Sequence, residues 1–293
     1  MREAELLRLI AERSRGLHGR GPVVLGPGDD CAVVELQGAT LLTVDQLVGG
    51  RHFDPASTPV DLIARKAVAR SVSDIAAMAG APVAALATGC LPRGFAGGDE
   101  LFERMAHWSA HWGCPLVGGD IATGDGPLVL TVTLIGAPHA ARGAVRRSGA
   151  RAGDGVFVTG ALGGSLASGR HLSFEPRVRE ARALADALGR GLHAMIDLSD
   201  GLGRDAGRIA EASGVRIELE AGQIPRHEGV AGWREAASEG EDYELLFTAP
   251  NGAVMPTAVR VTRVGRVVAG AGCVVRTQVG QIDARELGWD HAG

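Results

Sequence analysis

Carboxylates recur along this sequence beside glycines and at the ends of apolar runs. The segment GPGDDCAVV, residues 26–34, has two glycines and a proline followed at once by Asp29 and Asp30. Such residues are ordinary in turns, so this segment alone indicates a turn before a strand. Adjacent carboxylates also repel each other, however, and the pattern recurs. Further carboxylates occur in LLTVD (Asp45), SVSD (Asp74), LVGGD (Asp120), IDLSDGL (Asp197 and Asp200) and SEGEDYELLF (Glu239, Glu241 and Asp242).

Each of these carboxylates alone indicates a turn or a helix cap, but a set of them at strand ends indicates a metal site. Gathered carboxylates are costly unless positive charge lies among them. Oxygen-rich sites suit hard divalent cations, chiefly Mg²⁺, which usually bridges to phosphates. The implied ligand is therefore a nucleotide or another polyphosphate.

Two common phosphate-binding signatures are absent from the sequence. The chain has no G-x-x-x-x-G-K-[ST] loop and no protein-kinase signature, and Lys66 is its only lysine. The segment VTGALGG, residues 158–164, follows a predicted strand but lacks the full spacing of a dinucleotide-binding loop.

Composition excludes several other classes of protein. The net charge of −4 gives no basic surface for nucleic acid. No apolar run approaches the roughly 18 residues needed to cross a bilayer, and the first 16 residues predict an amphipathic helix rather than a signal peptide. The cysteines are widely spaced without a Cys-x-x-Cys pair, which excludes a zinc site and suits the reducing cytoplasm. We therefore expect a cytoplasmic protein without nucleic-acid or membrane partners.

A chain of 293 residues is long for a single core, so two domains are expected. Strand-like and helical patterns are mixed along both halves of the sequence, which predicts that each domain is α+β. The segment 137–154, rich in Ala, Gly and Arg, is interpreted as their connection. Strands are expected near 31–35, 40–45, 82–91, 127–136, 155–160, 215–219, 243–248 and 263–268, and helices near 61–79, 100–112, 176–188 and 202–213.

Seven motifs taken in order resemble the thiamine-monophosphate kinase family, a branch of the aminoimidazole ribonucleotide synthetase superfamily. The resemblance runs from about residue 24 to 248, with LGWD at 287–290 as a further element. It implies that the chain transfers the γ-phosphoryl group of ATP directly to thiamine monophosphate, forming thiamine diphosphate. The motifs are GPGDDCAVV, LLTVDQLVGGRHF, SVSDIAAMAGAP, LVGGD, RRSGARAGDGVFVTG, IDLSDGL and GEDYELLFT.

The resemblance also implies three sets of site residues. Several Mg²⁺ ions would be held by Asp30, Thr43, Asp45, Asp74, Asp120, Asp197 and Asp200. ATP would contact Gly119, Asp120, Arg147 and Ser199, and thiamine monophosphate would contact His52, Glu241 and Trp289. No catalytic residue beyond metal and phosphate positioning is implied, since the attacking phosphate oxygen is already ionised at neutral pH.

Several of these assignments have alternatives. His52 could be a surface histidine, Trp289 could be a packing residue, and Arg146 could take the place of Arg147. The chain also departs from the family pattern, with Val44 where Thr is usual, Ser71 where Asn is usual, and Ile121 and Ala122 after the Gly-Gly-Asp that Thr usually follows. Each departure removes or shortens a polar group.

The family fold implies an N-terminal ATP- and Mg²⁺-binding α+β domain of about residues 1–137 and a C-terminal α+β domain of about 148–293. Two N-terminal sheets would pair into a barrel across a homodimer. Two alternatives remain at this point: another ATP-using member of the superfamily with a different small-molecule substrate, and a non-catalytic nucleotide-binding paralogue.

Overall fold

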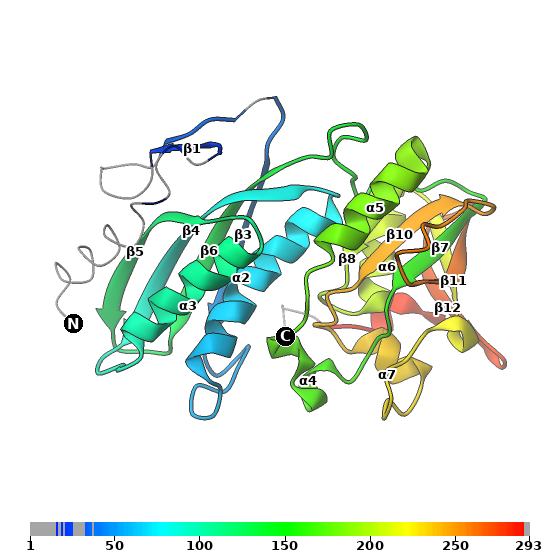
Figure 1. Ribbon diagram of the computed structural model, residues 1–293. Coiled ribbons are helices and arrows are strands. Elements are labelled where there is room, and N and C mark those ends of the chain that lie inside the picture. Colours follow the sequence, from blue (N-terminus) through cyan, green and yellow to red (C-terminus); the bar gives the residue numbers. More distant parts are fainter. Residues whose placement is uncertain (1–15, 17–18, 20, 26–32, 37, 290–293) are drawn as a thin grey trace. The chain divides into compact units, whose positions relative to one another are not determined.

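The computed structural model describes residues 16, 19, 21–25, 33–36 and 38–289 and divides into two units (Figure 1). Unit 1 comprises Met1–Ile75 with Ala81–Ala137, and unit 2 comprises Ala76–Gly80 with Pro138–Gly293. Three predictions lie outside the described residues: the N-terminal helix, the Asp29–Asp30 pair and the Asp290 end of LGWD.

Unit 1 is built on a four-stranded sheet in the order β3-β6-β4-β5, in which only β4 and β5 run parallel. Helices α2 (Val60–Ala77) and α3 (Gly98–His111) lie over one face of this sheet (Figure 1). The antiparallel pair of short strands β1 and β2 packs on the other face, where Val23 contacts Ala84 and Val117. The strands are β1 (Val23–Leu25), β2 (Val33–Val34), β3 (Leu41–Val48), β4 (Ala81–Pro92), β5 (Leu116–Gly124) and β6 (Val129–Ala137).

Alternating burial along the strands decides which face the helices cover. In β6, Leu130, Val132 and Leu134 are buried while their neighbours are half-buried. In β3, Leu42 and Val44 are instead 71% and 61% exposed, because they point away from the helices. The sheet therefore keeps an apolar face that is only partly covered within one chain.

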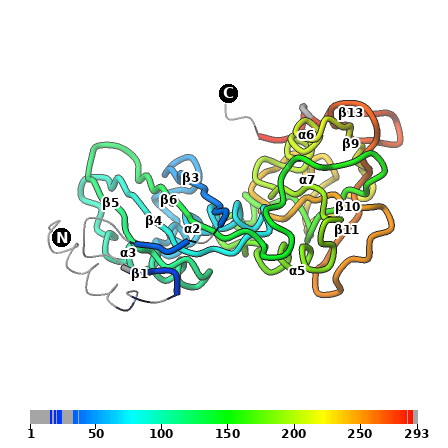
Figure 2. Tube along the Cα trace, turned by 90° about the horizontal axis from the view of Figure 1, so that it is seen from above, coloured from blue at the N-terminus to red at the C-terminus, as the bar shows by residue number. Residues whose placement is uncertain are grey.

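Unit 2 is built on a seven-stranded sheet in the order β13-β12-β9-β11-β7-β10-β8, with helices on both faces. The helix α6 (Leu202–Ser213) packs along β9 and β12 on one face, and Figure 2 shows α6 beside β9. The helix α5 (Val178–Leu188) packs on the other face against Met195 and the stacked pair Phe157–Phe247. The strands are β7 (Asp154–Thr159), β8 (Ala194–Asp197), β9 (Arg216–Glu220), β10 (Leu245–Pro250), β11 (Val261–Val268), β12 (Gly272–Thr277) and β13 (Gly280–Asp283).

Short helices complete unit 2, which also includes residues 138–154 of the predicted connection. The segment from residue 138 to 147 belongs to unit 2, and Val145 is buried in its core with Ala76 and Ala79. The remaining helices are α4 (Ser165–Ser168), α7 (Trp233–Ser238) and the 3-10 turns η2 (Arg170–Leu172), η3 (Gly189–Gly191), η4 (Ala221–Gln223) and η5 (Ala284–Glu286).

Both units contain strands and helices, as the sequence predicts. Two carboxylates, however, do not lie where the sequence predicts them. Asp45 and Asp120 lie inside β3 and β5, which continue to Val48 and Gly124, so they do not end strands as expected. Asp197 does end its strand, β8. Among the residues that the structure describes, no helix is both long and apolar enough to cross a membrane.

Candidate active site

In unit 1, strand β3 and helix α2 bring three of the predicted metal ligands to one face of the sheet. The Thr43 hydroxyl donates a hydrogen bond to Asp74 Oδ2. Two residues further along β3, Asp45 Oδ1 lies 3.2 Å from Arg70 Nη2, one helical turn before Asp74. Since the Asp45 side chain is 26% exposed, Arg70 balances its charge at the rim of the sheet. We refer to Thr43, Asp45, Arg70 and Asp74 as the β3–α2 cluster.

The predicted substrate residue His52 lies in the loop after β3, and this loop is fixed at two points. The backbone N–H of Val48 donates to His52 Nδ1 at 2.8 Å, so Nε2 carries the proton of the neutral ring. The ammonium group of Lys66, which is fully buried, donates to the His52 carbonyl at 2.8 Å. The single lysine of the chain therefore has a structural contact with this loop.

Unit 1 does not bring Asp120 to the β3–α2 cluster. Strand register pairs Asp45 with Val132, whereas Asp120 pairs with Thr88, which pairs with Thr131. Neighbouring residues of a strand point to opposite faces, so Asp45 and Asp120 lie on opposite faces of the sheet.

The alternation of side chains along β3 also shows where Val44, which stands where the family usually has Thr, points. At Gly119, the backbone of β5 comes too close to β4 for any side chain. Val44 lies on the open face, away from the β3–α2 cluster, so its missing hydroxyl does not affect that cluster. A Cβ atom on Gly119 would lie 1.9 Å from the carbonyl oxygen of Ala87, so only glycine fits beside β4 there.

In unit 2, backbone hydrogen bonds bring three predicted motifs together. The N–H groups of Glu241 and Tyr243 donate to the carbonyls of Ser199 and Leu198 at 2.8 and 2.9 Å. The Trp289 N–H donates to the Asp200 carbonyl at 2.8 Å, while the residue is 56% exposed. IDLSDGL, GEDYELLF and LGWD therefore meet around the loop after β8.

The buried carboxylates after β8 share one arginine that the sequence analysis missed. Arg208 on α6 donates to Asp200 Oδ2 and, at 2.6 Å, to Asp205 Oδ1. Asp205 also accepts the Asp200 N–H at 3.1 Å. Burial raises the pKa of Asp205 to about 7, against the lowering effect of Arg208. The Asp-x-x-Arg spacing on a predicted helix was the available signal for this pair.

The predicted ATP residue Arg147 lies at the surface of unit 2, where its backbone is held. Its carbonyl accepts a hydrogen bond from Ser213 Oγ at 3.1 Å, and the carbonyl of Arg146 accepts from the Met195 N–H at 3.0 Å. Both arginine side chains are exposed. Both side chains are therefore accessible to a ligand.

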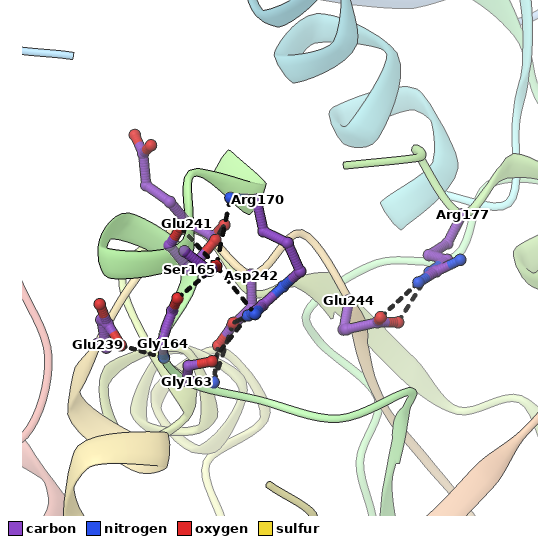
Figure 3. Close-up of polar contacts among 10 residues, drawn as sticks. Gly163, Gly164, Ser165, Arg170, Arg177, Glu239, Glu241, Asp242 and Glu244 are labelled. Carbon is purple, nitrogen blue, oxygen red and sulfur yellow. Dashed lines mark hydrogen bonds and ion pairs between the residues drawn. The ribbon is translucent and has the colours of Figure 1, made fainter. Parts of the chain in front are cut away.

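The glycine loop after β7 binds carboxylates rather than presenting free amides to a phosphate. The N–H of Gly163 donates to both Asp242 oxygens, at 3.0 and 3.1 Å, and the N–H of Gly164 donates to Glu239 (Figure 3). Burial raises the pKa of Asp242 to about 7, against the lowering effect of the Gly163 amide. This loop thus anchors the GEDYELLF segment.

The segment of residues 170–177 contacts each of residues 241–244, and no sequence motif indicated this. His171 Nδ1 lies 3.2 Å from Glu241 Oε2, and the rings of Phe174 and Tyr243 stack with centroids 3.8 Å apart. The ion pairs at the two ends are Arg170–Asp242 at 3.5 Å and Arg177–Glu244 at 2.5 Å (Figure 3).

Two residues of the 241–244 segment have backbone conformations that are unusual for side chains with a Cβ. Glu241 has φ = 63° and Tyr243 has φ = 52°, both in the left-handed region. Such strain persists only where surrounding contacts hold it, and it concentrates at functional sites. The contacts from residues 163–177 and 198–199 supply that support.

The predicted metal ligands are divided between the two units. Asp30 lies outside the described residues, Thr43, Asp45, Asp74 and Asp120 belong to unit 1, and Asp197 and Asp200 belong to unit 2. In the part of the chain that the structure describes, no group of three or more His, Cys, Asp or Glu side chains could hold a metal ion. A shared metal site therefore stays a prediction.

Both units match known families. The model of "AIR synthase related protein, N-terminal domain" matches residues 28–137, and that of "AIR synthase related protein, C-terminal domain" matches residues 129–288. The chain is 37% identical over 295 residues to the thiamine-monophosphate kinase of Rhodopirellula baltica, which covers 92% of this chain and 90% of the relative.

Solved structures agree with this match. The thiamine monophosphate kinase of Aquifex aeolicus is 28% identical with a TM-score of 0.75, covering 97% of this chain and 100% of that chain. AaThiL complexed with AMPPCP and TMP is also 28% identical with a TM-score of 0.75, covering 99% of both chains. The predicted division into two AIR synthase-type domains, each mixing strands and helices, is thereby confirmed, and the chain belongs to the thiamine-monophosphate kinase family.

Proposed function

We propose that this chain transfers the γ-phosphoryl group of ATP to thiamine monophosphate (TMP), forming thiamine diphosphate. The observation that carries the proposal is the 37% identity to a thiamine-monophosphate kinase over 92% of the chain. AaThiL, which shares the fold over 99% of both chains, was solved with AMPPCP, an ATP analogue, and TMP.

The chemistry is direct in-line transfer between two anionic phosphates. The attacking oxygen of TMP is already ionised at neutral pH, so no side chain has to remove a proton. The protein's task is to place the two phosphates in line and to offset their repulsion.

We propose Mg²⁺ as the cofactor, because the β3–α2 cluster presents a fitting set of donors. Two carboxylates and one hydroxyl, from Asp45, Asp74 and Thr43, lie on one face of the sheet. Hard oxygen donors of this kind suit Mg²⁺. When bound, Mg²⁺ would neutralise phosphate charge and hold the phosphates for attack. Asp30, Asp120, Asp197 and Asp200 are the other proposed Mg²⁺ ligands, and of these Asp120 lies on the opposite face of the unit 1 sheet from the β3–α2 cluster.

The substrate-binding residues are proposed from the family match and from their surroundings. ATP is assigned to Gly119, Asp120, Arg147 and Ser199. TMP is assigned to His52, Glu241 and Trp289, of which Trp289 has an exposed side chain and a fixed backbone. An indole face can stack on a cationic heterocycle.

We also propose that the chain is a cytoplasmic homodimer in which two sheets of unit 1 close into a barrel. The open face of that sheet supports this proposal, because Leu42, Val44 and Leu86 are 71%, 61% and 39% exposed on it. An exposed apolar patch of this kind indicates an interaction surface. The domain roles predicted from the sequence, with ATP and Mg²⁺ on residues 1–137, belong to the same proposal.

An assay with purified protein tests the function. Protein, ATP, Mg²⁺ and TMP are incubated, and the products are separated by chromatography, with reactions lacking TMP or Mg²⁺ as controls. Thiamine diphosphate is expected only in the complete reaction. Consumption of ATP without thiamine diphosphate would indicate a different substrate, and no consumption would indicate a non-catalytic paralogue.

A further inference from the structure

We propose that His171 is a positioning residue that fixes the Glu241 carboxylate for recognition of TMP. The inference rests on the proposed function, in which Glu241 contacts TMP, and it adds a residue that no sequence motif indicated. Its basis is a set of contacts that hold Glu241 in one conformation.

The backbone of Glu241 is held from two sides. Its N–H donates to the Ser199 carbonyl at 2.8 Å, and its carbonyl accepts a hydrogen bond from Ser165 Oγ at 2.6 Å. Together these contacts hold the left-handed φ of 63°. With the main chain fixed, the freedom that remains to this residue is the rotation of its side chain.

His171 acts on that remaining freedom. Its Nδ1 lies 3.2 Å from Glu241 Oε2, and the two side chains are only 11% and 17% exposed. A carboxylate can only accept hydrogen bonds, so Nδ1 carries the proton in this contact. Neighbouring contacts from Arg170 to Asp242 and from Phe174 to Tyr243 fix the backbone on either side of the imidazole.

The contact has a consequence for binding. A glutamate side chain loses rotamer freedom when it is ordered against a ligand, and that loss weakens binding. His171 imposes the order before TMP arrives. The ordered carboxylate then presents acceptor oxygens and negative charge to an amino group or a cationic ring, which are groups that TMP has and ATP phosphates lack. The effect should therefore appear on TMP and not on the triphosphate.

The test compares steady-state kinetics of His171→Ala and His171→Asn with the parent. His171→Ala should raise the KM for TMP about fivefold, the effect of freeing one long side chain, with the KM for ATP unchanged. His171→Asn should restore most of the loss, because its amide N–H can occupy the place of Nδ1–H. Melting curves show that each variant is folded.

Two further variants separate positioning from packing. Glu241→Gln should raise the KM for TMP, and adding His171→Ala to it should cause little further change, because the two residues act together. His193→Ala is the matched control, since its Nδ1 lies 2.9 Å from Asp154 Oδ2 with the side chain 9% exposed, away from Glu241. It removes the same kind of contact and should leave the KM for TMP unchanged.

The outcomes that overturn the inference are distinct from failure of the proposed function. A parent protein that forms no thiamine diphosphate contradicts the function itself. If the parent forms the product and His171→Ala keeps the parent's KM for TMP, the positioning role is overturned. The same holds if His171→Ala raises both KM values equally, if His171→Asn restores nothing, or if Glu241→Gln has no effect.

Discussion

Arginine side chains contact three of the carboxylates that made the sequence conspicuous, namely Asp45, Asp200 and Asp242. Asp45 pairs with Arg70 at the rim of unit 1, and Asp200 shares Arg208 with the buried Asp205 in unit 2. Asp74 instead accepts a hydrogen bond from the Thr43 hydroxyl. The repulsion expected from the sequence is therefore partly offset without metal, and Asp74 is the position where a change of charge is most informative.

Replacing Asp74 by Asn should separate stability from ligand binding. The amide oxygen can still accept the Thr43 hydrogen bond, so the metal-free variant should melt at the parent's temperature or above it. It should lose most of the stabilisation that Mg²⁺ and ATP give the parent, together with most of its activity, because binding adds stability in proportion to occupancy. Melting curves with and without Mg²⁺–ATP measure both effects.

A control on the same helix makes the Asp74 result interpretable. Asp61 accepts the Trp108 indole N–H at 3.0 Å and lies 3.6 Å from Arg104, so its role is structural. Asp61→Asn can still accept the Trp108 hydrogen bond but loses the ion pair with Arg104 and the favourable negative charge in the first turn of α2, so it should lower the melting temperature and keep the stabilisation by Mg²⁺–ATP. If metal-free Asp74→Asn behaves like Asp61→Asn, the proposed metal role of Asp74 is wrong.

Trp289 offers a test of substrate contact, because it is 56% exposed in the described structure and therefore adds little to the core. Trp289→Ala should raise the KM for TMP roughly fivefold, which corresponds to ~1 kcal/mol of stacking. The KM for ATP and the melting temperature should change little. Equal weakening of both substrates, or a clear loss of stability, would identify Trp289 as a packing residue instead.

Asp242 should make stability depend on pH, because burial raises its pKa to about 7. An aspartate in the unfolded chain has a pKa of about 4. The folded state thus holds the proton more tightly, and this stabilising contribution is present below pH ~4 and lost as the pH rises through ~7. The side chain introduced by Asp242→Asn has no proton to lose. The free energy of unfolding of the variant should therefore rise relative to that of the parent as the pH increases from 5 to 8.

Urea unfolding at several pH values measures this difference. Asp125→Asn is the control, because the Asp125 side chain is 85% exposed and pairs only with the surface residue Arg93 in the described contacts. A difference between Asp242→Asn and the parent that stays constant from pH 5 to 8 would show that Asp242 is already ionised in the folded protein.

At the scale of elements, the sequence predicts strands and helices where one period dominates. The helix α2 and strand β6 follow from their apolar spacing, and both agree with the prediction within two residues at each end. Strands β12 and β13 are short and interrupted by polar residues, so no alternation indicates them. The faces of Asp45 and Asp120 depend on strand register, which local sequence does not determine.

The open face of the unit 1 sheet predicts the oligomeric state. Val44→Glu places a charge on this face, where it would be buried against a second copy of the chain. The parent should scatter light as a dimer at micromolar concentration, and Val44→Glu should be a folded monomer. The control is Val279→Glu, since Val279 is 97% exposed in the turn between β12 and β13. A monomeric parent would contradict the proposed barrel.

At the scale of the whole molecule, the motifs identified the family, while the supporting contacts emerged only from the fold. Glu241 and Ser199 are far apart in sequence and meet through a backbone hydrogen bond. His171 and Arg208 belong to no motif, because their role depends on which carboxylate tertiary packing brings to them. Residues that lie in motifs are thus easier to single out from the sequence than the residues that contact and support them.

The proposed transfer can be tested by following the phosphoryl group itself. Protein is incubated with Mg²⁺, TMP and ATP labelled at the γ-phosphate, and the label is located after separation of the products. Direct transfer predicts that the label appears in the terminal phosphate of thiamine diphosphate, one for each ATP consumed. Label found only in inorganic phosphate, or left entirely in ATP, would contradict the claim.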